Sequence, residues 1–437
     1  MKSQQHWTSH QAAYRPAIIA SKSAMHRADP IVITGLGALT CAGPSVDDLW
    51  QAALASEVHV NEGPQQLEHT TCGISQIPQP AEIQRLVRKG DRLLPLALHA
   101  AGEAWRDAGL AETTPTRVGI IAGTSRGPIQ RVIDLAETHR DHRPRLSSAL
   151  HSIHSCLSGT LAMRFQARGP SLTISSACTS GAVAIALAAE QLLLGKADVM
   201  LAGAAEAPLT PFVLHQMAAA GFLGHHDEDP RFACRPFDRS RNGTVVGEGA
   251  GFMVLERASS AKTRGATIHA HLSGWSFASE AEHRATPNPD GHGLQHVARE
   301  ALHQAGLTAL DIAWINTHGT ATHANDLAET HAIQGLHMQG IPSSSTKPIT
   351  GHCLGATAAL EAILAVQAAK TGLLPPTATL REPDPACAIA LVQDRPFFTT
   401  GSHMLSLSQA FWGKTAALIL SKPNSDAISR ELAPSRS

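Results

Sequence analysis

Short apolar runs, often rich in β-branched residues, alternate along this chain with longer segments rich in Ala and Leu. The short runs predict strands at residues 31–35, 118–122, 172–176, 198–202, 251–255, 269–275 and 312–316. The longer segments predict helices at residues 95–108, 181–194, 294–305 and 354–370. Strands that alternate with helices are typical of α/β proteins whose sheets are largely buried. The sequence therefore predicts an α/β fold.

Composition narrows the classes of function. The chain has 437 residues, of which 43% are hydrophobic and 16% charged, and its net charge is −1. It is long enough for two domain-sized units with a large core. A nearly neutral chain has no electrostatic means of holding nucleic acid or an anionic membrane. The longest apolar stretch, residues 183–194, contains Glu190 and is too short to span a bilayer, so we expect no membrane insertion.

The seven cysteines are scattered, odd in number and without a CxxC pair. This pattern argues against a disulfide framework or zinc site and favours a reducing compartment, so we expect a cytoplasmic location. A metal site at residues 225–229 is not expected either, because Gly224 and Pro230 bracket a solvated acidic loop. Gly35 and Gly37 lack the third glycine of a dinucleotide fingerprint, so no nucleotide cofactor is expected.

The ends of the chain differ from its middle. Residues 1–28 contain basic residues but no acidic one. That composition is shared with organelle transit peptides, although a flexible extension over residues 1–29 is the favoured interpretation. Residues 423–437 are polar and are expected to be disordered.

Cys178 lies between a predicted strand, residues 172–176, and the predicted helix 181–194, which Gly195 ends. A thiol at a helix N-terminus is expected to favour the thiolate, because unsatisfied N–H groups and the helix dipole stabilise negative charge. Small residues on both sides leave room for a substrate. A buried structural cysteine is the alternative, and Cys178 taken alone leaves both interpretations open.

Two histidine segments strengthen the catalytic interpretation. His318 lies in Asn-Thr-His-Gly-Thr-Ala-Thr, residues 316–322, and His352 lies in Lys-Pro-Ile-Thr-Gly-His-Cys-Leu-Gly-Ala, residues 347–356. A cysteine can carry an acyl group, and loss of CO₂ from a second substrate makes an enolate whose oxygen needs donors. Two imidazoles can supply them through Nε2–H. One Cys–His pair would suffice for hydrolysis, whereas a second histidine and Lys347 point to a stabilised carbanion.

With these residues in place, the chain resembles the β-ketoacyl-acyl carrier protein synthases, the condensing enzymes of the thiolase-like superfamily. The resemblance extends from Ile31 to Leu420. Besides the two histidine segments, the matching stretches are Ile-Thr-Gly-Leu-Gly-Ala (33–38), Gly-Pro (169–170), Ala-Cys-Thr-Ser-Gly (177–181), Gly-Ala-Ala-Glu-Ala (203–207), Arg-Pro-Phe-Asp (235–238) and Gly-Glu-Gly-Ala-Gly (247–251).

The resemblance implies a five-layer αβαβα fold made of two similar halves, here residues 30–266 and 267–422. It implies that Cys178 is the nucleophile and that His318 and His352 assist decarboxylation. Lys347 would orient or electrostatically support His352. A similar placement of Cys178 and His352, each before an Ala-rich helix, also suggests an internal duplication.

The remaining roles also come from the resemblance. Asp326 and Glu329 would anchor the lysine or a polar network, and Glu361 would be a structural helix carboxylate. Thr320 and Thr322 would bind the phosphopantetheine arm. That arm belongs to an acyl carrier protein, so no cofactor of the chain's own is implied. A homodimer, or a heterodimer with a ketosynthase-like subunit, is also implied.

Two segments depart from the family. Where the family usually has Ser-Phe-Gly-Phe-Gly-Gly-Thr-Asn, residues 408–415 read Ser-Gln-Ala-Phe-Trp-Gly-Lys-Thr. Phe411 keeps the position of the gating phenylalanine, whose N–H joins that of Cys178 in the oxyanion hole. Ala410 and Trp412 replace glycines, which should stiffen the loop and forbid a positive φ. Arg126 stands where relatives have a branched apolar residue at the floor of the acyl pocket. A buried cation needs a partner, so Arg126 should either turn away or meet a polar or anionic group, which argues against a plain long saturated acyl chain.

We therefore expect a 3-oxoacyl-acyl carrier protein synthase that joins an acyl-cysteine to malonyl-carrier with loss of CO₂, in fatty acid or polyketide biosynthesis. Two alternatives stay open. One is an acyltransferase that keeps the acyl-cysteine but does not decarboxylate. The other is a chain-length partner subunit, which the intact set of Cys178, His318 and His352 disfavours.

Overall fold

The computed structural model describes residues 29–63, 73–77, 91–110, 117–138, 146–226 and 228–423. Apart from Asp29 and Pro423, the predicted N-terminal extension and C-terminal tail lie outside these residues. Among the described residues no helix has the length and apolar character needed to cross a membrane.

Ten strands form the central sheets, five in each half of the chain. The N-terminal five stand in the order β5-β4-β6-β8-β1, and the C-terminal five in the order β11-β10-β14-β15-β9. The first set comprises β1 (Ile31–Leu39), β4 (Val118–Gly123), β5 (Ser171–Ile174), β6 (Val199–Glu206) and β8 (Gly249–Arg257). The second comprises β9 (Ala270–Ser279), β10 (Ile312–Asn316), β11 (Ser343–Ser344), β14 (His403–Ala410) and β15 (Lys414–Ser421).

The two sets repeat one topology. In each, the third, second, fourth, fifth and first strands in chain order stand side by side. In each, the second strand runs parallel to its two neighbours, and the remaining pairs are antiparallel. The sheets join only where β1 meets β9, at Val32 with His271 and Ile33 with Ala270. The prediction of two similar halves is confirmed, and the predicted boundary at 266/267 falls between α10 (Ala258–Thr263) and β9.

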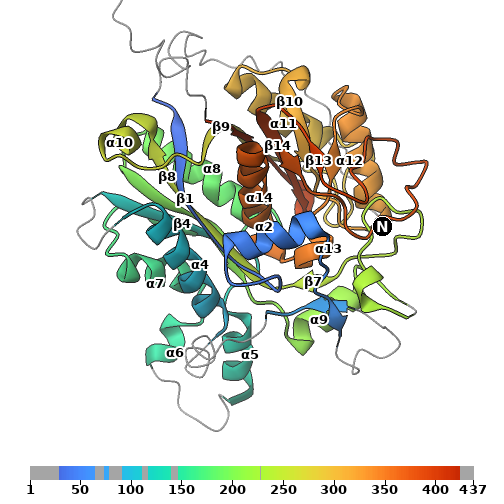
Figure 1. The fold of residues 1–437 in the computed structure, drawn as a ribbon. Helices are drawn as coiled ribbons and strands as arrows, with labels where there is room; N and C mark the ends of the chain where they lie inside the picture. The colour runs from blue at the N-terminus through green and yellow to red at the C-terminus, as the bar shows by residue number, and fades with distance from the viewer. Residues whose placement is uncertain are drawn as a thin grey trace, which may run out of the picture.

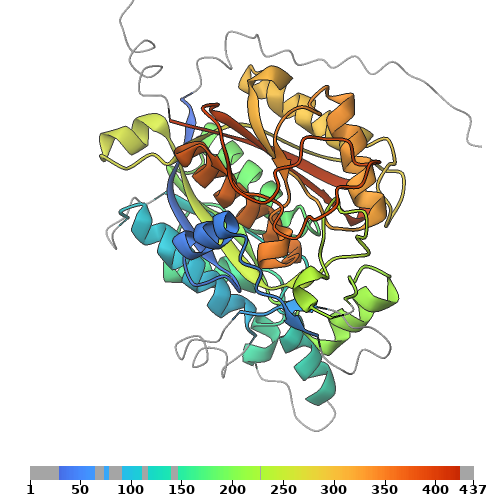
Figure 2. The ribbon, with the colours of Figure 1, turned by 45° about the vertical axis from the view of Figure 1, so that its right-hand side comes forward.

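Helices make up the other three layers. Between the two sheets lie α8 (Ser180–Leu193) and α14 (Thr357–Thr371), which pack on each other and on strands of both halves (Figure 1). The outer face of the N-terminal sheet is covered by α4 (Leu93–Asp107) and α7 (Cys156–Arg164), and that of the C-terminal sheet by α11 (His292–Ala305) and α12 (His323–Gly335). Figure 2 shows the two halves from a second direction, with α14 between them. The layers are therefore αβαβα, as predicted.

The composition of the two central helices explains their position. Both are rich in Ala and are buried on nearly every face, as expected for helices enclosed by other elements. They approach closely at Gly181, where an added Cβ would lie 2.7 Å from the backbone nitrogen of Ala359. A larger residue at position 181 would push the helices apart and move Cys178, which lies three residues earlier in the chain.

The remaining elements connect these layers. The helices are α2 (Val46–Ala55), α5 (Ile129–Thr138), α6 (Leu146–Leu150), α9 (Pro211–Ala219) and α13 (Lys347–Thr350). The 3₁₀ turns are η1 (Pro230–Phe232), η2 (Ala309–Asp311), η3 (Leu354–Ala356) and η4 (Phe411–Gly413). The short strands are β2 (Asn61–Glu62), β3 (Gly73–Ser75), β7 (Val246–Gly247), β12 (Leu373–Leu374) and β13 (Phe397–Phe398).

Candidate active site

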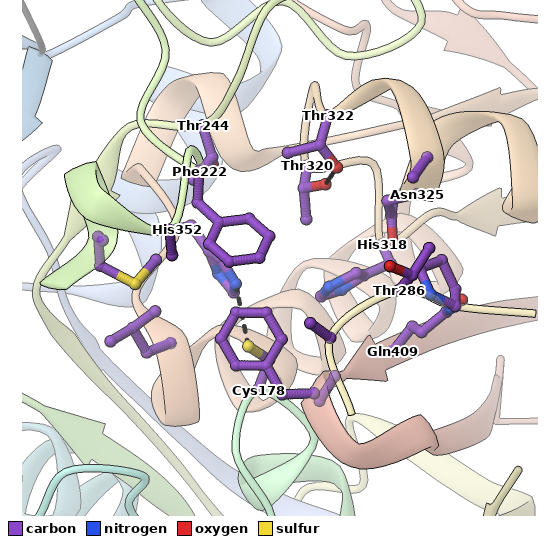
Figure 3. A pocket seen from close by; sticks show the side chains of 18 of the residues that line it. Cys178, Phe222, Thr244, Thr286, His318, Thr320, Thr322, Asn325, His352 and Gln409 are labelled. Carbon is purple, nitrogen blue, oxygen red and sulfur yellow. Dashed lines mark hydrogen bonds between the residues drawn. The ribbon is translucent and has the colours of Figure 1, made fainter. Parts of the chain in front are cut away.

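Three connections place the predicted catalytic residues at one cavity. Cys178 lies between β5 and α8, His318 follows β10, and His352 lies between α13 and η3. All three line a cavity of about 360 Å³, which Figure 3 shows from close by. Because β5 and β11 are equivalent strands of the two halves, the cysteine and His352 come from equivalent positions, each ahead of a central helix.

A tight turn presents the cysteine. Ala177 has a φ of 48°, a left-handed value that is strained for a residue with a Cβ. The Ser180 hydroxyl donates to the carbonyl of Ala177 at 2.6 Å and accepts from the N–H of Ser176 at 2.8 Å. The Thr179 hydroxyl donates to the carbonyl of Ser176 at 2.7 Å. These bonds hold the turn in a conformation that puts the Cys178 thiol at the cavity.

His352 contacts the sulfur directly. Its Nε2 lies 3.1 Å from Sγ of Cys178 (Figure 3). Its Nδ1 lies 2.9 Å from the hydroxyl of Thr357. A hydroxyl can donate or accept, so the Thr357 contact is compatible with a proton on either ring nitrogen. His352 can therefore take a proton from the thiol at Nε2 or offer an N–H there.

His318 is held differently. The Nζ of Lys347 lies 3.3 Å from Nδ1 of His318, donates to the His318 carbonyl, and lies 2.7 Å from the Glu361 carboxylate. An ammonium group can only donate, so Nδ1 of His318 is the acceptor and its proton is on Nε2. The two imidazole rings are 5.5 Å apart between centroids and nearly perpendicular, at 84°.

Burial keeps both rings neutral. It lowers the pKa of His318 and of His352 well below the usual value, and the positive charge of Lys347 lowers both further. Neutral imidazoles suit a site that must hydrogen-bond to a developing oxyanion, because no permanent charge has to be neutralised between turnovers.

The protonation state of the Cys178 thiol differs from the expectation. Burial raises the pKa of Cys178 to about 12, and the charge of Lys347 only partly opposes this. The predicted thiolate at a helix end is therefore wrong for the free protein: desolvation of a buried sulfur outweighs the modest effect of a helix dipole. The resting group is a thiol, and its proton has to leave when the reaction begins.

The acidic residues support the backbone and the lysine. Glu329 accepts from the backbone N–H of His318 at 2.6 Å and of Gly319 at 2.8 Å. Asp326 accepts from the N–H of Phe237 at 2.9 Å. Burial raises the pKa of Glu329 to about 8 and that of Glu361 to about 7.

The contacts of Lys347 decide between the alternatives for its role. Its side chain contacts His318 and does not orient His352, on which it acts through its charge, the electrostatic alternative. Its carboxylate partner is Glu361 of α14. Asp326 and Glu329 belong to the polar network and do not anchor the lysine.

The threonines and the phenylalanine expected at the cavity line it, whereas the backbone of the neighbouring loop differs from the expectation. Thr320 and Thr322 line the cavity with their hydroxyl oxygens 2.9 Å apart. Phe411 also lines it and packs on Phe222, with ring centroids 4.8 Å apart. The loop from Phe411 to Gly413 closes a tight hairpin between β14 and β15, and Trp412 adopts a φ of 65°. The expectation that replacing glycine forbids a positive φ is therefore wrong at Trp412.

Arg126 is not part of the cavity wall. Its guanidinium donates to the side-chain oxygen of Gln216 on α9 at 3.2 Å, and its backbone N–H donates to Glu206. It is absent from the residues that line the cavity among those described. Arg126 therefore does not lie in the cavity, where it was expected at the floor of the acyl pocket, but its side chain turns away to a polar partner, as expected for a cation at this position.

Other cavity residues carried no recognisable sequence signal. They come from α9 and the loop after it, the loops before β7 and α11, α12 and the end of β14: Met217, Phe222, Thr244, Thr286, Asn325 and Gln409. Gln409 alone could have been noticed, because it replaces the first phenylalanine of the family's loop pattern.

The two-half αβαβα fold, with a cysteine faced by two histidines at the central helices, defines the class of thiolase-like proteins. Within that class the chain belongs to the beta-ketoacyl synthase family: residues 28–261 match the family's N-terminal domain and residues 269–381 its C-terminal domain.

Relatives agree along nearly the whole chain. A 3-oxoacyl-[acyl-carrier-protein] synthase 2 of Coxiella burnetii is 34% identical over 412 residues, which are 90% of this chain and 98% of that protein. Among solved structures, a type II polyketide acyl-carrier protein in complex with its ketosynthase superposes with a TM-score of 0.83 at 27% identity, covering 91% of this chain and all of that one. The ishigamide ketosynthase/chain length factor gives a TM-score of 0.83 at 28% identity, with the same coverage.

Proposed function

We propose that this protein is a 3-oxoacyl-acyl carrier protein synthase that joins an acyl group to a malonyl unit with loss of CO₂. The observation that carries the proposal is the cavity in which Sγ of Cys178 lies 3.1 Å from Nε2 of His352, with the second ring, His318, beside it. A relative named for this activity, similar over 90% of the chain, supports it.

The first half-reaction loads the cysteine. As the thiol attacks the thioester carbonyl of an acyl-carrier, its proton passes to Nε2 of His352, and the carbon–sulfur bond to the carrier breaks. The departing pantetheine sulfur takes that proton, so the acyl group is now on Cys178 and His352 is neutral again. Proton transfer during attack is required because the pKa of Cys178 is about 12.

The second half-reaction forms the carbon–carbon bond. The malonyl group loses CO₂, and the electron pair of the broken bond moves onto the thioester oxygen. His318 donates to that oxygen through Nε2–H, the tautomer that Lys347 imposes. His352 adds a second donor when Thr357 donates to Nδ1. The carbanion then attacks the acyl carbon, the bond from that carbon to Sγ of Cys178 breaks, and the departing thiolate takes one proton from solvent to restore the thiol.

The two histidines therefore have unequal roles. The ring of His318 is fixed as a donor, whereas His352 can exchange tautomers through the Thr357 hydroxyl. His352 serves both half-reactions and His318 only the second. Thr320 and Thr322 lie at the cavity where the pantetheine arm would enter, and Phe411 would gate that entrance. No group beyond the carrier's pantetheine is needed for either step.

Partners follow from the same proposal. A carrier protein delivers both substrates, and a second ketosynthase-like subunit, identical or not, completes a dimer. The similar ketosynthases bound to a carrier protein and to a chain length factor support this. We place the activity in the cytoplasm, which six buried free cysteines among the described residues support.

Stepwise variants test the proposal. Cys178→Ala should fold normally but lose acyl loading from acyl-carrier, measured by intact-protein mass spectrometry. His318→Ala should keep loading and lose malonyl-dependent product. His352→Ala should lose both.

Three outcomes would contradict the proposal. Condensation by Cys178→Ala would refute the nucleophile. Product formation without release of CO₂ would indicate a non-decarboxylating acyltransferase. A wild-type protein that cannot be loaded would indicate a chain-length partner subunit.

A further inference from the structure

Gln409 brings an unpaired amide to the cavity wall. Its side chain is 3% exposed and lines the cavity at the end of β14. Neither its Nε2 nor its Oε1 has a hydrogen-bond partner among the described residues. Its cross-strand neighbour on β15, Thr415, is 1% exposed and its hydroxyl is also without a partner there. Buried polar groups are nearly always paired, so three unpaired atoms on one strand pair point to a ligand.

The position of Gln409 selects one part of the substrate. Gln409, Thr286 and Asn325 lie on the His318 side of the cavity, whereas Phe222 and Thr244 lie toward His352 (Figure 3). The acyl chain starts from the sulfur beside His352. Under the proposed function, the malonyl thioester oxygen binds at His318, so the malonyl unit is the part of the substrate that lies nearest Gln409.

The charge of the malonyl carboxylate limits which residues of the cavity can bind it. A malonyl unit carries a free carboxylate until CO₂ leaves. Among the described residues that line the cavity there is no lysine or arginine, and burial keeps the pKa of both histidines low. The charges of Lys347 and Arg126, which oppose the raised pKa of Cys178, act from outside the cavity lining. Direct hydrogen bonds to a carboxylate in the cavity must therefore come from neutral donors, and the Gln409 amide is a buried donor that is still unused.

We propose that Gln409 binds the free carboxylate of the malonyl unit through Nε2–H. This inference rests on the proposed function and adds a specificity-determining residue to it. The hydrogen bond forms before CO₂ leaves and is lost as the negative charge moves to the thioester oxygen. It therefore strengthens binding of the malonyl substrate without accelerating its decarboxylation.

The test is a single-turnover experiment on protein that already carries an acyl group on Cys178. Malonyl-carrier is varied, and product is measured for the wild type, for Gln409→Met and for the control Gln334→Met. Gln334 lies on α12, donates to the carbonyl of Ala388 and does not line the cavity. Methionine matches glutamine in length but has no N–H donor.

Gln409→Met should raise the half-saturating concentration of malonyl-carrier about tenfold to a hundredfold, the usual effect of losing a hydrogen bond to a charged group. The maximal rate should stay the same or rise. Inhibition by acetyl-carrier, which has no carboxylate, should not change. The melting temperature should not fall, because the substitution removes a buried unpaired amide. Gln334→Met should behave as wild type in every assay.

Several results would overturn the inference. An unchanged half-saturating concentration would do so, and so would an equal weakening toward malonyl- and acetyl-carrier. A lower melting temperature with equal loss of loading and condensation would make Gln409 a structural residue. If the effect depended on oxygen substituents of the acyl chain instead, Gln409 would contact that chain. A wild-type protein that does not condense refutes the proposed function itself.

Discussion

His318 and His352 present similar rings to the cavity, but the groups behind them differ. A lysine that only donates fixes one ring, and a hydroxyl that can donate or accept leaves the other free to change its tautomer. The Cys178 thiol, which contacts His352, is neutral at rest. At the scale of single residues, reactivity in this site depends on hydrogen-bond partners more than on standing charge.

The raised pKa of Cys178 predicts its response to pH. Because the folded protein holds the thiol neutral up to a pKa of about 12, alkylation of Cys178 by iodoacetamide should keep accelerating from pH 7 to 10, by about tenfold per pH unit. Site-resolved mass spectrometry measures the rate. In urea, the unfolded chain should level off near the ordinary thiol pKa of about 8.5. A plateau at Cys178 below pH 9 in the folded protein would contradict a neutral resting thiol.

The buried pair of Lys347 and Glu361 predicts a stability difference. Their Nζ and Oε1 atoms are 2.7 Å apart, and the side chains are 0% and 3% exposed. Glu361→Ala leaves a buried charge with no counter-ion, so it should lower the free energy of unfolding by about 3–5 kcal/mol. The matched control is the exposed pair Arg239–Glu382, whose charged atoms are 2.9 Å apart and where Glu382→Ala should cost less than about 1 kcal/mol. Equal effects in urea denaturation would be inconsistent with this assignment.

At the scale of elements, local sequence patterns predicted the helices and strands that apolar periodicity encodes directly. The strands at β1, β4, β5, β6, β8, β9 and β10 and the four long helices lie close to their predicted positions because apolar periodicity is a local property. The hairpin of β14 and β15 was not predicted, since its turn contains Trp412 where a glycine is expected. The contact of Lys347 with His318, and the position of Arg126, depend on tertiary packing that spacing in the sequence does not encode.

That hairpin predicts two opposite glycine effects. Trp412 has a φ of 65° and is 66% exposed, whereas Ala410 has an extended φ of −153°. Trp412→Gly should raise the free energy of unfolding by up to about 1 kcal/mol, because glycine adopts the left-handed conformation without strain. Ala410→Gly should lower it by about 0.5–1 kcal/mol, because only the entropy of the unfolded chain increases. Chemical denaturation of both variants measures the change in the free energy of unfolding. A change of the same sign in both variants would show that the φ angle at the turn does not govern stability.

At the scale of the whole molecule, the two ends of the strand array differ. At one end β11 is buried, with Ser343 and Ser344 inaccessible. At the other, β5 pairs only with β4 among the described strands, and Leu172 on it is 48% exposed. Met163 on α7, which packs on β5, is 77% exposed. An edge strand with exposed apolar side chains is a site for pairing with another chain.

We therefore expect a dimer that forms through β5. The wild-type protein should sediment as a dimer at micromolar concentration, and Leu172→Lys should shift it toward the monomer, because a buried ammonium at a strand-to-strand contact has no counter-ion. Leu310→Lys is the control: Leu310 is 92% exposed on η2, in the C-terminal half. Both proteins are compared by analytical ultracentrifugation. If Leu172→Lys stays dimeric, or if Leu310→Lys dissociates equally, the dimer contact lies elsewhere and the exposure of β5 has another cause.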